Sequence, residues 1–193
     1  MRKHCISFLL FALLAGQALA APQLKAGVFE PPRAAPALAL VAGSGQQFKL
    51  DEYRGKVVLL AFGYTHCEAV CPVTLAMLAQ AMQQLGPDAA RVQVVFASVD
   101  PERDDPARMG AWVRQFDQRF AGLTGGRQQV DAVLQAYGIT VQKHPMGANG
   151  YVLSHSSYIY YIDRKGMLRA LLPFGRPAAD VVHDVRALLK EPA

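Results

Sequence analysis

Apolar positions along the chain follow two periods, one typical of buried strands and one typical of amphipathic helices. Two nearly continuous apolar runs, KVVLLAFGY at 56–64 and VQVVFASV at 92–99, predict central strands of a sheet covered on both faces. Two further strands are expected at YVLSHSSYIYYI (151–162) and MLRALLPF (167–174), joined by the turn DRKG. Near the start, residues 37–50 predict an N-terminal β-hairpin that turns at residues 43–45.

Four stretches carry apolar residues at helical spacing. Pro72 suits the first position of a helix, where its missing N–H costs no hydrogen bond, and Gly86 followed by Pro87 suits the end of that helix. Helices are expected over 72–85, from near 105 to 116, over about 128–137 and from 177 onward. Two strands alternating with helices, then a hairpin and a closing helix, predict a mixed α/β fold with a central sheet flanked by helices. Thioredoxin-like domains use this order.

The first 36 residues differ in pattern from the rest of the chain. Residues 1–20 combine a basic start, an apolar run and a small-residue box, which is the layout of a signal peptide cleaved before Ala21. The apolar run is shorter than the roughly 20 residues of a membrane-spanning helix, so an uncleaved anchor is the second interpretation. Residues 21–36 are rich in alanine and proline and are interpreted as a linker. We therefore expect one thioredoxin-like domain over 37–193 in a periplasmic or otherwise exported protein, attached to the inner membrane only by association or by that anchor.

The charge of the chain excludes one class of partner. Removing Arg2 and Lys3 with the signal leaves 18 basic residues against 15 acidic ones, a net charge of +3. The basic residues are scattered, without a Lys/Arg run interleaved with aromatic residues, so no nucleic-acid partner is expected.

The expected oligomeric state is a monomer. Outside the cytoplasm a close cysteine pair tends to oxidise unless it is kept reduced or holds a metal.

Cys67 and Cys71 stand four positions apart in FGYTHCEAVCPVTL, while Cys5 is expected to leave with the signal. If a helix begins at Pro72, Cys71 occupies its N-cap, where unpaired N–H groups and the helix dipole stabilise a thiolate. A purely structural disulfide here would close a very short loop and add little stability. Three intervening residues allow the sulfurs either to join in a disulfide or to open around an ion. A redox couple and a metal site both remain open on these grounds.

A metal site needs more than two sulfurs, and four histidines follow residue 20. His155 is the strongest candidate because it lies in a serine-flanked break before an apolar strand, a segment that a thioredoxin-like fold places beside the cysteine helix. His183 is expected on the polar side of the last helix, and His66 beside the site or on the surface. His144 is weaker, although its glycine-containing loop QKHPMGANG, which also holds Met146, is a hypothetical point for handing over an ion. Two thiolates and one imidazole suit copper(I) and also hold copper(II), whereas zinc normally takes a fourth ligand.

Three separated motifs give the chain a family resemblance. GKVVLLAFGYTHCEAVCP at 55–72, SVDPERDDP at 98–106 and YVLSHSSYIYYIDRKG at 151–166 resemble the Sco/SenC family of copper-binding, thioredoxin-like proteins that assist cytochrome c oxidase assembly. The similarity runs from about Leu38 to the end of the chain. It implies that the two cysteine ligands of the family fall on Cys67 and Cys71 and its histidine ligand on His155, and that its aspartate-proline turn falls on Asp100.

The resemblance also implies a function and partners. A metallochaperone of this family carries copper to the dinuclear copper centre of the oxidase, so the expected partner is the copper-bearing subunit of cytochrome c oxidase or another copper protein. Two positions depart from the family pattern: Glu68 and Ala69 replace Pro-Asp after the first cysteine, and Ser154 replaces the aspartate before the histidine. Neither change removes a ligand, but both put the exact client in doubt.

Other functions compete for the same residues. The main alternative is an extracytoplasmic thiol-disulfide oxidoreductase that reduces cysteines of a copper-site client, with Cys67 as the attacking and Cys71 as the resolving sulfur. A peroxidase is disfavoured because Ala61 stands where peroxiredoxins carry a proline four positions before Thr65. A sensor that uses the same site is not separable from a chaperone at this stage. The discriminating residue is His155, which a metal carrier needs and a thiol enzyme does not.

Overall fold

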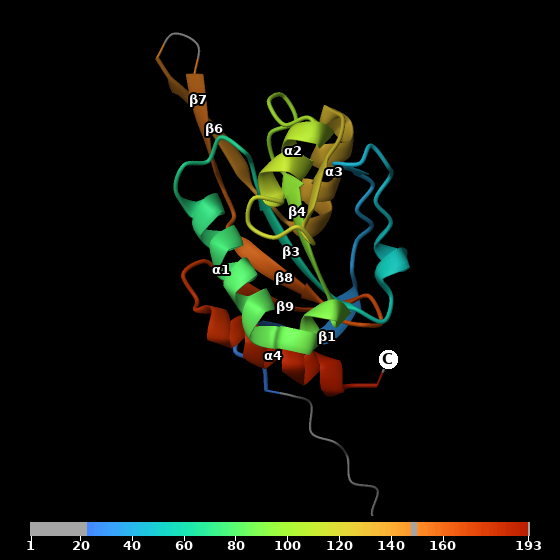
Figure 1. Ribbon diagram of the computed structural model, residues 1–193. Helices are drawn as coiled ribbons and strands as arrows, with labels where there is room; N and C mark the ends of the chain where they lie inside the picture. The colour runs from blue at the N-terminus through green and yellow to red at the C-terminus, as the bar shows by residue number, and fades with distance from the viewer. Residues whose placement is uncertain (1–22, 148–149, 193) are drawn as a thin grey trace, which may run out of the picture.

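The apolar run after Gly55 forms β3 (Val57–Gly63), which lies in the middle of a seven-stranded sheet (Figure 1). This computed structural model describes residues 23–147 and 150–192. β3 pairs in parallel with β4 (Val92–Ser98) and antiparallel with β8 (Tyr158–Ile162). All seven residues of β3 are buried. The prediction of a central strand covered on both faces is confirmed.

The sheet is mixed, with the strand order β1-β9-β8-β3-β4-β5-β2. The strands not yet given are β1 (Gly27–Ala34), β2 (Val41–Ala42), β5 (Ala121–Thr124) and β9 (Met167–Pro173). β5 pairs in parallel with β4 and was not predicted, because four residues with a glycine among them carry too little periodicity to stand out. The parallel strands β3, β4 and β5 bring the loops at their carboxyl ends to one edge of the sheet.

The four helices are α1 (Val70–Leu85), α2 (Pro106–Val113), α3 (Arg127–Tyr137) and α4 (Ala178–Lys190), with short 3-10 turns at η1 (Leu50–Tyr53) and η2 (Gly86–Arg91). All four expected helices are therefore present. α1 and α4 pack side by side across one face of the sheet (Figure 1). α3 packs on the opposite face. The thioredoxin-like arrangement of a central mixed sheet between helices is confirmed.

β3 divides the core into two apolar clusters by its alternation. Val57, Leu59 and Ala61 point to the cluster shared with α1 and α4, whereas Val58 and Leu60 point to the cluster shared with α3. Both clusters consist largely of residues that are less than a tenth exposed. The end of β3 is therefore held rigidly from both sides, and the loop that leaves it starts from a fixed point.

The interpretation of residues 21–36 as a linker is wrong for residues 27–34. They form β1, an edge strand that pairs antiparallel with β9 from Gly27↔Leu171 to Ala34↔Met167. The two consecutive prolines in EPPR are compatible with this place, because an edge strand hydrogen-bonds on one side only and the register shifts between Val28 and Arg33. The buried carboxylate of Asp184 on α4 accepts the backbone N–H groups of Lys25 and Ala26 at 2.7 and 2.9 Å, so the folded part extends ahead of residue 37.

The hairpin expected over 37–50 is a chain reversal with little strand. The N–H of Ala42 donates to the carbonyl of Gln46, and Val41 bridges antiparallel to Gln47. β2 itself pairs with β5 at the far edge of the main sheet.

The single strand expected over 151–162 is two strands with different partners. β7 (Gly150–His155) pairs with β6 (Val141–Met146) in a two-stranded ribbon, while β8 begins at Tyr158 and joins the main sheet. The predicted loop QKHPMGANG is thus mostly strand. Figure 1 shows this β6–β7 ribbon projecting from the body of the protein. The chain changes sheet at Ser156 and Ser157, which an apolar pattern alone does not reveal.

The expected signal peptide over 1–20 and the first two residues of the expected linker, 21 and 22, lie outside the described residues. Within the described part of the chain, no helix is long and apolar enough to cross a membrane.

Candidate metal centre

The cysteine pair lies at the carboxyl end of β3. Cys67 is in the loop that leaves the strand, and Cys71 is the second residue of α1. The expected N-cap position for Cys71 is wrong by two residues, because the helix begins at Val70 and Ala69 is its N-cap. Cys71 still lies in the first turn, and its N–H, unpaired within the helix, points to Cys67 Sγ at 3.4 Å. Both cysteines are free thiols.

The pKa values of the two thiols are shifted in opposite directions. Cys71 is 2% exposed, whereas Cys67 is only partly buried. A hydrogen bond from the Cys71 thiol, helped by the N–H groups of Cys71, Ala69 and Val70, lowers the pKa of Cys67 to about 5. The same bond, together with burial, raises the pKa of Cys71 above its usual range. At neutral pH the pair therefore consists of one reachable thiolate and one buried thiol that donates to it.

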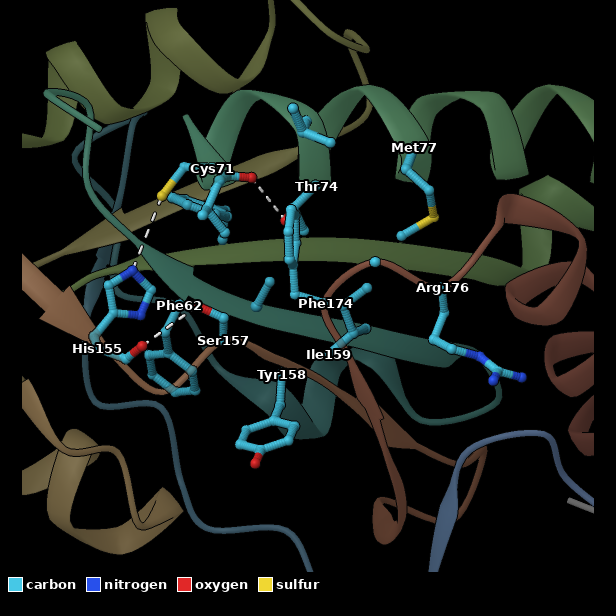
Figure 2. A pocket seen from close by; sticks show the side chains of 15 residues that line it. Phe62, Cys71, Thr74, Met77, His155, Ser157, Tyr158, Ile159, Phe174 and Arg176 are labelled. Carbon is cyan, nitrogen blue, oxygen red and sulfur yellow. Dashed lines mark hydrogen bonds between the residues drawn. The ribbon is translucent and has the colours of Figure 1, made fainter. Parts of the chain in front are cut away.

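His155 approaches the pair from the ribbon. It is the last residue of β7, and its Nε2 lies 4.0 Å from Cys71 Sγ, as Figure 2 shows, although 84 residues separate the two in sequence. The other ring nitrogen, Nδ1, is 3.0 Å from the backbone carbonyl of Ser156. A carbonyl only accepts, so Nδ1 carries a proton, and in the neutral ring Nε2 is the unprotonated nitrogen that faces the sulfur. This tautomer suits a ligand nitrogen.

A cavity of about 150 Å³ adjoins this meeting point. Its lining includes Cys71 and His155 at one end (Figure 2). Its remaining walls are mainly apolar, with contributions from Phe96, Met77 and Ile159. The sulfur and nitrogen thus lie beside a mostly apolar hollow rather than in a polar, water-filled cleft.

The distances allow one ion to be shared. Metal–nitrogen and metal–sulfur bonds are roughly 2.0 and 2.3 Å long, so two ligands of one ion stand at most about 4.3 Å apart. The 4.0 Å between Cys71 Sγ and His155 Nε2 falls inside that limit. Across residues 23–147 and 150–192, no three His, Cys, Asp or Glu side chains already form a closed metal site. Cys67 lies beside this pair, since the Cys71 N–H points to its Sγ at 3.4 Å.

The other histidines lie elsewhere. The ring of His66 is 3.2 Å from the hydroxyl of Thr65, at the surface. His144 is on the ribbon, 2.8 Å from Ser154 Oγ, and His183 on α4 contacts Asp184. Of the four candidates, only His155 is brought to the cysteines.

Asp100, expected in an aspartate-proline turn, lies in one. Its N–H bonds to Ser98 Oγ, and its backbone carbonyl accepts from Arg103 and Asp104. Its buried carboxylate accepts from the side chains of Arg103 and Tyr151, which is on the ribbon.

Sequence reasoning missed two residues that hold the cysteine loop. Asp104 is 1% exposed and accepts from the N–H and hydroxyl of Thr65 and from Ser98 Oγ. Burial raises the pKa of Asp104. Tyr64 accepts the Cys67 N–H on its carbonyl and the Leu153 N–H on its hydroxyl. Asp104 belongs to the quoted run SVDPERDDP, so an acidic residue inside that motif was the available signal.

Comparison with known proteins gives consistent matches. The SCO1/SenC family model matches residues 30–190. The mouse mitochondrial SCO2 homolog is 36% identical over 150 residues, which cover 76% of this chain and 59% of the mouse protein. The chain thus matches less than two thirds of that relative's length.

Two solved structures are similar in both fold and sequence. ScoI of Bradyrhizobium japonicum with copper bound has a TM-score of 0.72 and 32% identity, over 82% of this chain and 98% of that one. Apo Sco1 of Thermus thermophilus has a TM-score of 0.75 and 34% identity, over 88% of this chain and 99% of that one.

Proposed function

The chain belongs to the SCO1/SenC family, and from that premise we propose that it is a copper-binding metallochaperone. Its ligands are the thiolates of Cys67 and Cys71 and the imidazole of His155. Its cargo goes to the dinuclear copper centre of cytochrome c oxidase, carried by the copper-bearing subunit of that enzyme. The protein acts as an exported monomer. The copper bound to the 32% identical ScoI structure supports the choice of metal.

One observation carries the proposal: His155 Nε2 faces Cys71 Sγ at 4.0 Å, although the two residues are 84 positions apart in the sequence. A thiol enzyme has no need of this imidazole, whereas a copper carrier gains its third ligand from it. Two soft sulfurs and one nitrogen favour copper(I) and also accept copper(II).

The unequal burial of the two sulfurs suits a carrier. Cys71 is buried among apolar side chains of the core, so it retains the ion, while the partly exposed Cys67 is the side from which an acceptor's ligand can enter. The mainly apolar cavity wall beside Cys71 and His155 keeps competing water ligands few.

The test is copper(I) titration of the reduced protein without oxygen. We expect one copper per chain. Cys67→Ser and Cys71→Ser should weaken binding by more than about 100-fold, because each removes a ligand and not merely a supporting contact. His155→Ala should weaken it by roughly 10- to 100-fold. His183→Ala removes an exposed imidazole on α4 and serves as the matched control. Copper affinity that is indifferent to His155→Ala would refute the three-ligand site.

A second function is favoured by the thiols themselves. The lowered pKa of Cys67 and the protonated, adjacent Cys71 match an attacking and a resolving sulfur. In such an oxidoreductase the Cys67 thiolate attacks a client disulfide, and Cys71 then displaces the client as a thiolate, leaving Cys67 and Cys71 joined. Cys71→Ser should trap the mixed disulfide in metal-free protein. Unchanged reduction of a client disulfide in His155→Ala would favour this function over the carrier.

A further inference from the structure

His155 stands at the base of an element that is outside the main sheet. Among the described residues, β6 and β7 pair only with each other. The site of His155 therefore depends on where the ribbon sits against the body of the protein. The contacts that fix the ribbon come from side chains of the loop after β4 and from the end of β3.

Arg103 is at the centre of these contacts. Its guanidinium lies over the ring of Tyr151 at 3.6 Å and over the ring of Tyr64 at 5.6 Å. Its Nη1 donates to the backbone carbonyl of Tyr151 at 3.0 Å, and its Nε donates to Asp100. One planar cation thus lies against both β7 and Tyr64, the residue that follows β3 and leads to the cysteine loop.

Tyr151 adds a second attachment from the ribbon. Its hydroxyl donates to Asp100 Oδ1 at 2.7 Å, and Asp100 is 1% exposed. Burial and this bond raise the pKa of Tyr151, so the hydroxyl stays a donor. Tyr151 and His155 are four residues apart on one strand, which puts both side chains on the same face of the ribbon.

Tyr64 connects this set to the metal site. Its hydroxyl accepts the Leu153 N–H at 3.1 Å, between Tyr151 and His155 along β7. Its ring meets the ring of His155 edge to face, with centroids 6.3 Å apart. Its carbonyl accepts the Cys67 N–H at 3.2 Å. The same residue therefore holds the cysteine loop and the histidine strand.

We propose that Tyr64, Asp100, Arg103 and Tyr151 form a ribbon clamp that positions His155 against Cys71. They are positioning residues, because none of them supplies a ligand atom. The inference rests on the proposed copper site and adds how its third ligand is held. Without the clamp, the ribbon keeps its own pairing but swings relative to α1, and the imidazole loses its fixed distance to the sulfur.

The clamp is tested by Tyr151→Phe and Arg103→Gln. Tyr151→Phe keeps the ring under the guanidinium and removes only the hydroxyl, so it is the milder variant. Each should lower copper affinity roughly 10-fold, the effect typical of losing a group that orients a ligand. Arg119→Gln is the matched control, since the exposed Arg119 pairs with Asp117 in the loop between α2 and β5. Its copper affinity should stay within about twofold of the starting protein.

A double-mutant cycle separates positioning from general damage. In a His155→Ala background, Tyr151→Phe and Arg103→Gln should cause no further loss of affinity, because the ligand that they position is gone. In the copper(II) form, nitrogen coupling in the electron paramagnetic resonance spectrum should weaken in both clamp variants and persist in Arg119→Gln. Unchanged affinity, or equal losses with and without His155, would overturn the clamp.

Failure of the copper site itself gives a different pattern. If the starting protein binds no copper, or if His155→Ala has no effect, the proposed function is wrong. The clamp is then judged on metal-free protein, by hydrogen exchange of the Leu153 amide. Faster exchange in Tyr151→Phe and Arg103→Gln than in Arg119→Gln supports a clamp on the ribbon, and equal exchange rejects it.

Discussion

The two halves of the candidate metal centre are held by different kinds of force. The cysteine half is built on β3 and α1, where Cys71 is enclosed by apolar side chains of the core. The histidine half is built on the β6–β7 ribbon, which is attached through Arg103, Tyr151 and Tyr64. Packing makes the first half rigid, while a few polar and stacking contacts place the second. A change in the core should therefore disturb the sulfurs, and a change at Arg103 or Tyr151 should disturb mainly the imidazole.

The largest expected effect is on the ionisation of Cys67, which tests the cysteine half alone. Its alkylation rate with iodoacetamide should rise with pH through an inflection at about 5, because the thiolate is the reactive form above the pKa. Cys71→Ala removes the thiol donor that contributes most to this low pKa, so the inflection should move upward toward the ordinary value of 9.0. At a pH below the pKa of Cys67 in both proteins, each unit by which the substitution raises that pKa lowers the thiolate population about tenfold.

The matched variants for this measurement are Cys67→Ser and His155→Ala. Cys67→Ser reports any background from Cys5 and Cys71. His155→Ala should leave the inflection near 5, because no contribution of the imidazole lowers the pKa of Cys67. An inflection that stays near 5 in Cys71→Ala would mean that the backbone N–H groups alone hold the thiolate.

Gly63 gives the next largest effect, through packing. A Cβ at this last residue of β3 would lie 2.7 Å from Cys71 Sγ and would also collide with Phe96. Gly63→Ala should lower the free energy of unfolding by about 1–3 kcal/mol, as overpacking does. It should also weaken copper binding, because the sulfur must move. Chemical denaturation and copper titration measure the two effects.

Gly27→Ala is the control for Gly63→Ala. Gly27 is in the edge strand β1, and an added Cβ there meets only Leu171 O, at an ordinary 3.8 Å. We expect a change in unfolding free energy within about 0.5 kcal/mol and no change in copper affinity. Equal effects of the two substitutions would show that the end of β3 is not tightly packed.

The cysteine half and the histidine half also differ in how far the sequence predicts them. The cysteine half was predictable because its determinants are local: a continuous apolar strand, then a proline-marked helix start. Cys71 was misplaced by two residues at the helix end, where N-terminal turns are hard to delimit. Long-range arrangement was less accessible. The pairing of residues 27–34 with β9 and the break between β7 and β8 depend on partners far along the chain.

His155 was identified by fold order and family resemblance, and in the structure its Nε2 lies 4.0 Å from Cys71 Sγ. The clamp was not identified. Tyr151 and Arg103 are separated by 48 residues and meet only once the ribbon folds back over the loop after β4. A charged residue in a turn and an aromatic residue in a strand each look ordinary in the sequence.

The smallest expected effect concerns the outer face of the ribbon. In the ribbon His144 pairs with Val152 and Met146 pairs with Gly150, so His144 and Met146 lie on one face. His155 pairs with Val141 and lies on the other face. Met146 is 58% exposed, and His144 bonds to Ser154. The hypothesis that His144 or Met146 hands over the ion therefore requires side chains on the face of the ribbon opposite to His155.

His144→Ala and Met146→Ala should accordingly change little. We expect copper(I) affinity, and the rate at which a colorimetric copper(I) chelator removes the ion, to stay within about twofold of the starting protein, as for surface substitutions in general. Tyr151→Phe, on the inner face of the same ribbon, is the contrasting variant and should speed the removal. A marked slowing of copper release in Met146→Ala would restore the thioether as a transfer ligand, and with it a metal path along the outer face of the ribbon.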